Sequence, residues 1–538
     1  MNALDLDIQR VGNGGCVTSV GMMNGAQEES VLASRKVISK NRRFRDHVTT
    51  PAAVVSLLLM IGYTVFVMRF AVNVPVSDEW FYSIGIVNSA IHHTLSLPQL
   101  WTPWLDGHLF IPGVLLWILG PITHLNFRVF IFLNSLLYCI SFVVVMTLVR
   151  ITAKPPIKLQ HVLCLGLAWF SLSGIDNALW AFMNQIYLVL LFIPLMILLL
   201  NRAMTRDQAS FVLLTCSVAC AVGASLSCMQ GMIAWPVGLL VLLWTPNHVQ
   251  QRWRSISIWL ISATLMTLLF LVGYNAGHNA CVADAASCSP AYSLHHPVAA
   301  LSYFSTLIGN IIPTTTSALW SGANQYQIIH QHLGELILVA AICVVVYSFK
   351  YRSAISASFL APAFIVTGLI WDILITIARV GIGQGTALQS HYNTPQVLIL
   401  IGIIIGTFSF LTLASNDQTE SRFRLSKRKT IRPMLTLSVV LFLLIIALGD
   451  VIGFQNAQRS HSTNAYSAQV LANLNQVPSQ KRGCFINIVA GYGLYTPLQA
   501  EVKYGKTIRI LKNDQLSIFY SPVYNSYRHQ GLPLFPYC

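Results

Sequence analysis

Two neighbouring carboxylates, Asp78 and Glu79, are the side chains of this 538-residue chain best suited to chemistry. They lie in the stretch "VPVSDEW" (74–80), directly after the first long apolar run. The chain has only 18 acidic residues, so an acidic pair at the edge of an apolar segment needs a reason. One carboxylate could deprotonate a hydroxyl group. The pair could also simply begin a helix, with Ser77 or Asp78 as the N-cap.

Other polar and aromatic residues stand at the edges of apolar runs in the same way. An arginine could hold a phosphate group, and a tryptophan could stack on a sugar ring. Each could equally serve the membrane interface, where arginines snorkel and aromatic residues gather. The candidates for substrate binding are Arg69, Asp106, His108, Asp176, Asn177, Trp180, Gln185, Arg379, His391 and Tyr392.

The elements that must position these residues are membrane-spanning helices. Apolar residues make up 55% of the chain and charged residues only 9%, against about 25% charged in a soluble domain. A spanning helix needs about 20 mainly apolar residues. We predict eleven spans, near 52–73, 127–149, 160–176, 184–201, 208–226, 229–245, 256–274, 333–349, 354–378, 393–413 and 435–453.

Two further apolar runs, 109–124 and 298–313, are ambiguous between a span and a surface helix. If both lie along the outer surface, the basic loops all fall on one side, as the positive-inside rule requires. The N-terminus is then cytoplasmic and the C-terminus periplasmic. The net charge of +15 is thereby assigned to cytoplasmic loops and anionic lipid rather than to nucleic acid.

This topology predicts three regions. Residues 1–50 form a cytoplasmic basic segment, and 51–453 form the transmembrane domain with outer loops 74–126 and 275–332. Residues 454–538 form a small periplasmic α+β domain, because "CFINIVAGYGLY" and "TIRILKNDQLSIFY" alternate as strands do. Cysteines confined to outer segments are disulfide candidates. They are Cys281, Cys288, Cys484 and Cys538.

The outer placement of the acidic pair indicates which reaction it could perform. Nucleotide sugars and ATP are absent outside the cytoplasm, so group transfer there needs a donor delivered in the membrane. A polyprenyl-phosphate sugar meets that need. A carboxylate would activate an acceptor hydroxyl, and an arginine would hold the charge of the leaving phosphate.

Several stretches resemble landmarks of the GT-C superfamily of membrane glycosyltransferases. They are "SDEW", "LDGHLFIPGVLL", "DNALWAFMNQIYLVLLF", "SLSCMQGMIAWPVGLL" and "ARVGIGQGTALQSHYNTPQVL", spread over about 50–450. The layout is most similar to phage-type, serotype-converting O-antigen glucosyltransferases of the bacterial inner membrane. The resemblance implies Asp78 as the base or a metal-linked carboxylate and Glu79 as its partner. It also implies that Arg379 and His391 contact phosphate.

The chain departs from the expected family pattern at three positions. An Asn-Glu-His-Arg motif is replaced by the stretch that contains Asp106 and His108, and its arginine is lost. A Ser-Arg-Tyr motif becomes Ser390-His391-Tyr392, and a Glu-Asn pair becomes Asp176-Asn177. Because two arginines are lost, the identity of the donor stays open. An altered or reduced activity also stays open.

The leading interpretation is a glycosyltransferase that modifies a cell-surface polysaccharide or lipid. A transporter or flippase of a lipid-linked glycan is an alternative, although it should show repeats and more mid-membrane charges. An O-antigen ligase or polymerase would share the same geometry. No cofactor is indicated with certainty; a divalent metal stays open, and no Cys or His spacing indicates structural zinc.

Overall fold

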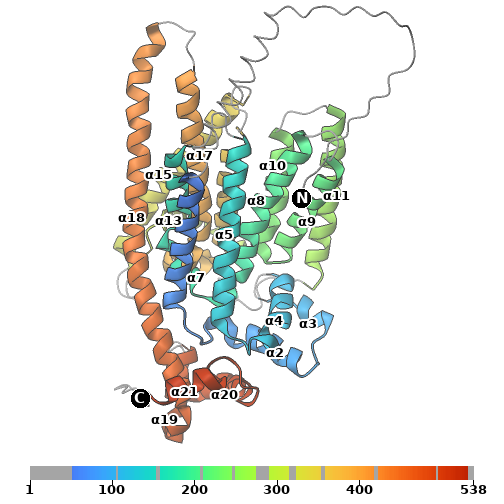
Figure 1. The fold of residues 1–538 in the computed structure, drawn as a ribbon, viewed down its shortest axis with the longest axis vertical. Helices are drawn as coiled ribbons and strands as arrows, with labels where there is room; N and C mark the ends of the chain where they lie inside the picture. The colour runs from blue at the N-terminus through green and yellow to red at the C-terminus, as the bar shows by residue number, and fades with distance from the viewer. Residues whose placement is uncertain are drawn as a thin grey trace, which may run out of the picture. The chain divides into compact units, whose positions relative to one another are not determined.

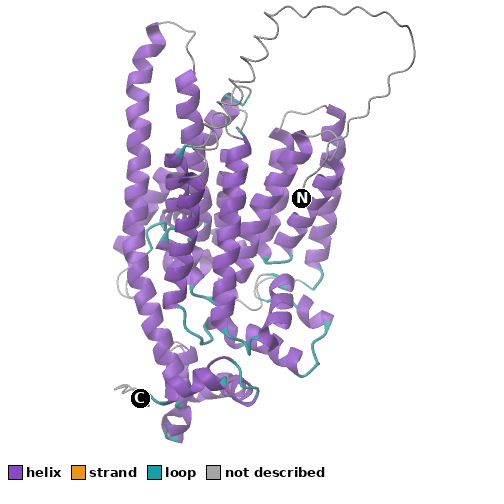
Figure 2. Ribbon diagram, viewed as in Figure 1, coloured by secondary structure: helices purple, strands orange, loops and turns teal. Residues whose placement is uncertain are grey.

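The computed structural model describes the chain from residue 51 to residue 530, apart from internal gaps. Nine gaps separate the ten described ranges, which are 51–104, 107–152, 158–205, 210–244, 249–273, 290–313, 323–352, 358–416, 422–491 and 495–530. Val54–Cys538 forms one compact unit. Over the described residues the elements are helices (Figure 2), and the single β-bridge joins Trp104 to Gly107.

Eight helices of the described chain are long and apolar enough to cross a membrane. They coincide with eight of the eleven predicted spans and establish a helical, multi-pass membrane protein. The longest, α18, has 51 residues and continues past residue 453. The helices that contain these spans are Pro51–Phe70, α5 (Phe127–Thr152), α8 (Asn184–Thr205), α11 (Val249–Leu271), α15 (Ala323–Lys350), α16 (Leu360–Arg379), α17 (Thr394–Asn416) and α18 (Arg422–Ala472).

The other three predicted spans correspond to shorter helices: α6 (Leu159–Trp169), α9 (Ser210–Ser225) and α10 (Ala234–Trp244). The count of eleven spans therefore stays a prediction. The two ambiguous runs form α4 (Phe110–Ile122) and α13 (Pro297–Gly309), each of 13 residues. At 1.5 Å per residue each is about 20 Å long, which is too short to cross a hydrocarbon core of about 30 Å.

The long helices lie side by side along a common direction, so their ends form two groups (Figure 1). At one end, Trp244 of α10 contacts Phe349 of α15 and donates to Ser358, just before α16. Exposed basic residues such as Lys350 and Arg352 belong to this end. The opposite end carries the polar candidates for function. Which end faces the periplasm stays a prediction.

Short elements build that opposite end. They connect the long helices and bring distant parts of the sequence together. They are η1 (Ser77–Trp80), α2 (Tyr82–Ile91), α3 (Leu97–Trp101), η2 (Leu172–Gly174), α7 (Ile175–Ala178), η3 (Ala181–Met183), η4 (Met229–Ile233), α12 (Pro290–His295), η5 (Val380–Ile382), η6 (Gln384–Leu388) and η7 (Ser390–Tyr392).

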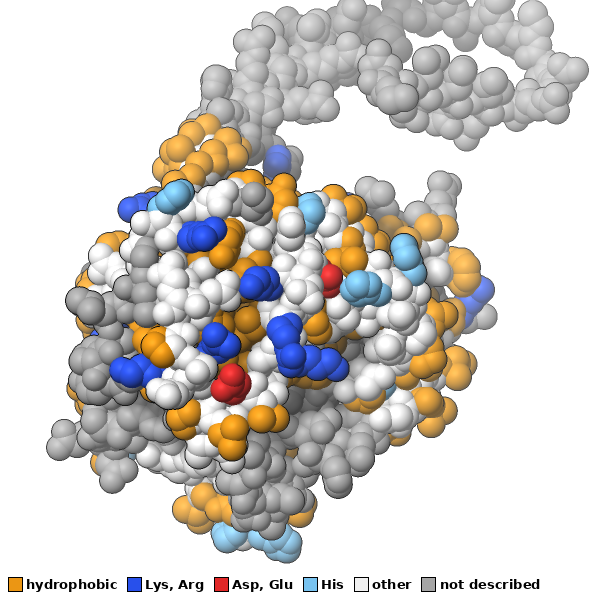
Figure 3. Space-filling model, turned by 90° about the horizontal axis from the view of Figure 1, so that it is seen from below, with side chains coloured by type: hydrophobic (Ala, Val, Ile, Leu, Met, Phe, Trp, Pro, Cys, Tyr) orange, Lys and Arg blue, Asp and Glu red, His pale blue; other side chains and the backbone are white. Residues whose placement is uncertain are grey.

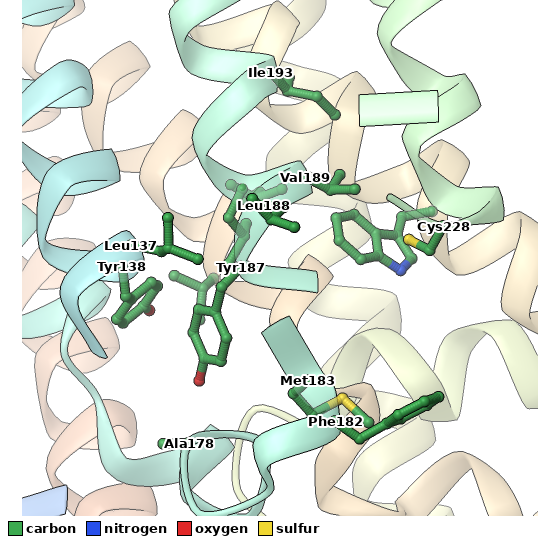
Figure 4. Packing of buried hydrophobic residues seen from close by; sticks show 14 of the residues in the cluster. Leu137, Tyr138, Ala178, Phe182, Met183, Tyr187, Leu188, Val189, Ile193 and Cys228 are labelled. Atoms are coloured by element: carbon green, nitrogen blue, oxygen red, sulfur yellow. The ribbon is translucent and has the colours of Figure 1, made fainter. Parts of the chain in front are cut away.

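The core beside these elements is formed by α5 and α8 (Figure 4). Tyr138 of α5 and Tyr187 of α8 meet edge to face, with ring centroids 5.3 Å apart. Leu137 and Leu188 pack in the same layer. Apolar contacts of this kind, together with dispersion between closely packed side chains, fix the end of α8 from which η3 reaches the site.

The C-terminal segment corrects one prediction, because its described residues contain helices and no strand. They form η8 (Leu474–Gln476), α19 (Ser479–Gly491), α20 (Pro497–Asn513), η9 (Ser517–Phe519) and α21 (Ser521–Arg528). The buried residues of α20 recur at helical spacing, as Tyr504, Ile508 and Leu511. A helix signal was present in the sequence: Thr496 and Gln499 form a capping box around Pro497.

The structure describes one of the four cysteines that were predicted to form disulfides. Cys484 is disulfide-bonded, whereas the other six cysteines of the described residues are free. Cys281, Cys288 and Cys538 lie outside the described residues, so the predicted pairs stay predictions.

Candidate functional site

The turn η1 presents Asp78, and its neighbour Glu79 holds that turn in place. Glu79 is only 1% exposed. Its Oε2 accepts from the Val76 backbone N–H at 2.7 Å, and its Oε1 accepts from the Phe182 backbone N–H at 2.8 Å. The Trp180 indole N–H donates to the Val76 carbonyl at 3.2 Å. Two of these hydrogen bonds join the η1 turn to the η3 region, and the third closes the turn itself, so that together they fix the direction of Asp78.

The backbone at this turn is itself unusual. Ser77 has φ +49°, a left-handed conformation that costs a residue with a side chain about 1–2 kcal/mol. The N-cap residues of η1 and α2 are Val76 and Phe81, so neither Ser77 nor Asp78 has the predicted capping role. A strained turn held by a buried carboxylate is typical of a functional position.

Removing the Glu79 carboxylate is expected to destabilise the protein. Glu79→Ala leaves the N–H groups of Val76 and Phe182 without acceptors, and we expect a loss of about 3 kcal/mol in the free energy of unfolding. Thermal unfolding in detergent, followed by the reactivity of buried cysteines, measures the change. Glu335→Ala, at an exposed position of α15, is the control and should leave the melting temperature unchanged. Equal melting temperatures for wild type and Glu79→Ala would contradict this role.

A second segment, 176–185, positions η7 through two polar side chains. Asn177 is buried and donates from Nδ2 to the His391 carbonyl at 2.8 Å and to Thr394 Oγ1 at 3.0 Å. The carboxylate of Asp176 accepts from the hydroxyl groups of Ser390 and Ser460. These contacts tie η7 to α7 and α18, so the predicted pair acts on the position of His391.

The third segment leads from Arg379, at the end of α16, to His391. Gly383 has φ +130°, which only glycine adopts readily, and it separates η5 from η6. His391 lies beside Trp180 with ring centroids 6.1 Å apart. The short 3₁₀ turns thereby return the chain to the same end of the bundle at which α16 finishes.

These segments enclose one cavity of about 280 Å³. This volume is near the lower end of the roughly 300–1,000 Å³ range of small-molecule sites. Its wall includes six predicted residues, contributed by four separate parts of the sequence. They are Asp78, Trp180, Gln185, Arg379, His391 and Tyr392.

The cavity wall brings together the carboxylate of Asp78, whose pKa is raised, and the guanidinium of Arg379. Burial raises the pKa of Asp78 to about 6, although the Arg379 guanidinium and the Trp104 indole N–H act in the opposite direction. Burial also raises the pKa of Glu79 to about 8. Environments that separate two carboxyl pKa values assign them different roles. Near neutral pH, Asp78 is the anion that faces the cavity, whereas both oxygens of Glu79 are occupied by backbone N–H donors.

His391 differs from the arginine expected in its motif, because it carries no charge near neutral pH. Burial, together with the positive charge of Arg379, lowers its pKa to about 4. A neutral imidazole can still donate or accept one hydrogen bond on each ring nitrogen. Arg379 is therefore the cation of the described cavity wall.

Four predicted residues do not line this cavity. Arg69 is exposed, on the helix Pro51–Phe70. His108 is fully buried, stacked on Trp101, with Nδ1 2.5 Å from the Trp101 carbonyl and Nε2 2.9 Å from the Phe270 carbonyl. Asp176 and Asn177 act through η7, as described above. Asp106 lies outside the described residues.

The cavity wall also includes residues that the prediction left out, notably Gln230 and Trp371. Trp371 lies within the predicted span 354–378, where a buried core tryptophan looks the same in sequence. Gln230 stands in "SLSCMQGMIAWPVGLL", one of the stretches singled out for its resemblance. A polar residue in the middle of that apolar stretch was the available signal.

The described side chains do not fit a divalent metal ion. No three His, Cys, Asp or Glu side chains of the described residues come together as a metal site. Among the described residues of the cavity wall, Asp78 is the one carboxylate, and Arg379 stands on the same wall. Hard cations prefer several oxygen ligands and little positive charge nearby.

Comparison with known proteins gives only remote likeness. The sequence matches no protein-family model, and no curated protein is similar to it at a significant level. The archaeal oligosaccharyltransferase AglB from Archaeoglobus fulgidus, in complex with an inhibitory peptide and a dolichol-phosphate, is 11% identical with a TM-score of 0.41. The alignment covers 80% of this chain and 59% of that one.

A second solved structure, the Archaeoglobus fulgidus oligosaccharyltransferase in complex with Zn and sulfate, is 12% identical with a TM-score of 0.41. The alignment covers 79% of this chain and 56% of the other. This chain thus spans less than two thirds of the length of both proteins. Similarity at this level identifies neither a family nor an activity.

Proposed function

We propose that this protein is a glycosyltransferase that moves a sugar from a polyprenyl-phosphate donor to a cell-surface polysaccharide or lipid. The observation that carries the proposal is that Asp78 and Arg379 line one cavity at the ends of membrane-spanning helices. A carboxylate that is a base near neutral pH and a fixed cation are what transfer from a lipid phosphate needs. The sequence resemblance to GT-C enzymes supports the same reaction.

In the proposed reaction, Asp78 takes the proton of an acceptor hydroxyl as the hydroxyl oxygen attacks the anomeric carbon of the donor sugar. The bond between that carbon and the phosphate oxygen breaks, and both of its electrons leave with the lipid phosphate. The Arg379 guanidinium stabilises the phosphate charge through paired N–H donors. No proton needs to be supplied to the leaving group, because a phosphate mono- or diester is stable as an anion.

The remaining wall of the cavity suits a carbohydrate. Trp104 and Trp180 present aromatic surface, and Gln185 and Gln230 present amide groups that can both donate and accept hydrogen bonds. His391, neutral near pH 7, adds one more polar contact. Aromatic faces with a few amide groups bind the apolar ring faces and the hydroxyl groups of a sugar.

The pH dependence of transfer is expected to follow Asp78. Because its pKa is raised to about 6, the base is protonated and inactive below that pH and ionised above it. We expect kcat/KM to rise about tenfold per pH unit up to about pH 6 and then to level off. Initial rates between pH 4.5 and 8 provide the measurement. The acidic limb of the profile, which is the rise of kcat/KM with pH below about pH 6, should persist in His391→Gln. A wild-type profile that is flat from pH 4.5 to 8 would contradict the assignment.

The proposed activity has a direct test. Membranes that contain the protein are supplied with a radiolabelled polyprenyl-phosphate sugar and a cell-surface polysaccharide fraction, and label in the polysaccharide is counted. The expected result is label transfer that depends on this chain. Donor that crosses the bilayer without any transfer would instead support a flippase, and transfer of whole preassembled glycans would support a ligase or polymerase.

A further inference from the structure

The C-terminal helices present a basic face beside the turn that carries Asp78. Residues 479–530 contain seven Lys and Arg but only two acidic residues, Glu501 and Asp514. Figure 3 shows Lys and Arg side chains gathered on the surface seen from below. Six of them are exposed: Lys481, Lys503, Lys506, Arg509, Lys512 and Arg528.

The packing of α20 connects this face to the candidate site. Tyr504, on the buried side of α20, contacts Trp80 and Phe81 with ring centroids 5.8 Å and 5.2 Å apart. Lys503 lies over the Phe81 ring at 5.4 Å. The helix therefore rests on η1 and the start of α2, two or three residues along the chain from Asp78.

The same packing directs the basic side chains away from the membrane helices. Residues three and four apart share a face of a helix, so Lys506 and Arg509 project on the side opposite Tyr504. Since Tyr504 points into the bundle end, these two side chains point away from it. Lys512, four residues after Ile508, lies at the edge of the buried face, where its Nζ donates to Asn475 Oδ1 at 3.4 Å. A helix that binds the surface of its own bilayer would turn its basic face toward the lipid instead.

Little negative charge opposes the basic face. Of the two acids of this segment, Asp514 is engaged with His92, whose Nε2 lies 3.4 Å from its Oδ2. Glu501 is exposed on α20, one turn before Gly505. The face therefore keeps a net positive charge, and a field of one sign attracts and concentrates ligands of the opposite charge.

We infer that this face, defined by Lys506, Arg509, Lys512 and the neighbouring exposed basic residues, binds an anionic acceptor polysaccharide that carries carboxylate or phosphate groups. The inference rests on the proposed function and specifies its acceptor class. A repeating anionic polymer can span the distance from the basic face to the cavity. One of its hydroxyl groups then reaches Asp78 while charged groups further along the polymer stay on α20.

Binding to defined polymers tests the inference. The full-length protein in nanodiscs of zwitterionic lipid is titrated with polygalacturonate, with a phosphomannan and with neutral dextran, and affinity is measured by thermophoresis. We expect binding to one or both of the charged polymers, weakened by added salt, and none to dextran. The triple variant Lys506→Gln, Arg509→Gln, Lys512→Gln should bind the charged polymer about tenfold more weakly.

The matched control removes three exposed basic residues from the opposite end of the helices. Arg254→Gln, Lys350→Gln, Arg352→Gln changes the net charge equally and should leave binding as in wild type. Unchanged binding by the α20 variant, or equal loss in both variants, would overturn the inference. Binding of the protein to phosphatidylglycerol vesicles, without binding to either charged polymer, would also overturn the inference.

The outcomes separate this inference from the proposed function. If the wild-type protein transfers no label, the proposed activity falls, whereas loss of polymer binding in the α20 variant would still locate the binding face. If the α20 variant binds normally while Asp78→Asn is inactive, the enzyme assignment stands and the acceptor class proposed here is wrong.

Discussion

Asp78→Asn is expected to lower the rate of sugar transfer by about 10²–10⁴-fold, the range that a positioned general base contributes. Asparagine has the size of aspartate but cannot take the acceptor proton. The Asp78 side chain lies on the cavity wall and not in the hydrogen bonds that hold the turn, so the variant should fold. Transfer of label from the polyprenyl-phosphate sugar provides the measurement.

Two controls distinguish loss of the base from loss of structure. The melting temperature of Asp78→Asn should match that of wild type, in contrast to Glu79→Ala. The residual activity of the variant should also lose the limb near pH 6, because the group that titrates there has been removed. Full activity in Asp78→Asn, with wild-type pH dependence, would refute the assignment of this residue as the base.

Arg379→Gln is expected to lower kcat/KM by about 10²-fold, because a preorganised charged donor no longer stabilises the leaving phosphate. Arg379→Lys should recover part of the loss, since lysine keeps the charge without the paired N–H geometry. Rates with saturating and limiting donor separate effects on kcat from effects on KM. Arg150→Gln, at an exposed position near the end of α5, is the matched control and should retain wild-type rates.

The pH profile of Arg379→Gln gives a second signature that simple misfolding would not produce. The guanidinium lowers the pKa of Asp78, so its removal should move the pH limb upward from about 6. Arg379→Lys should leave the limb closer to its original position. A limb that stays at the same pH in Arg379→Gln would show that the two groups do not interact as the structure indicates.

Much of the membrane architecture was predictable from apolar runs alone. Eight of the predicted spans coincide with long helices because about 20 consecutive apolar residues have few other stable arrangements. The C-terminal segment was mispredicted as containing strands, since short alternating stretches such as the one around Ile508 fit two periods. The buried positions of α20 follow the helical period, which only the packed structure identifies.

The candidate site was likewise predictable only in part from the sequence. Residue types at the ends of apolar runs were enough to single out Asp78, Arg379 and His391. Sequence could not separate His391, on the cavity wall, from His108, which is buried between two backbone carbonyls. Each histidine stands just before an apolar run, and each has a partner far away in the sequence: Phe270 for His108 and Asn177 for His391.

The sequence by itself determined that this is a helical membrane protein with an acidic pair beside its first span, because hydrophobicity and span length are local properties of the chain. The tertiary structure alone decided which member of that pair faces the cavity. Glu79 is held by backbone N–H groups of Val76 and Phe182, which leaves Asp78 to share a cavity with Arg379. That choice depends on contacts between segments far apart in sequence, and so on packing rather than on local composition.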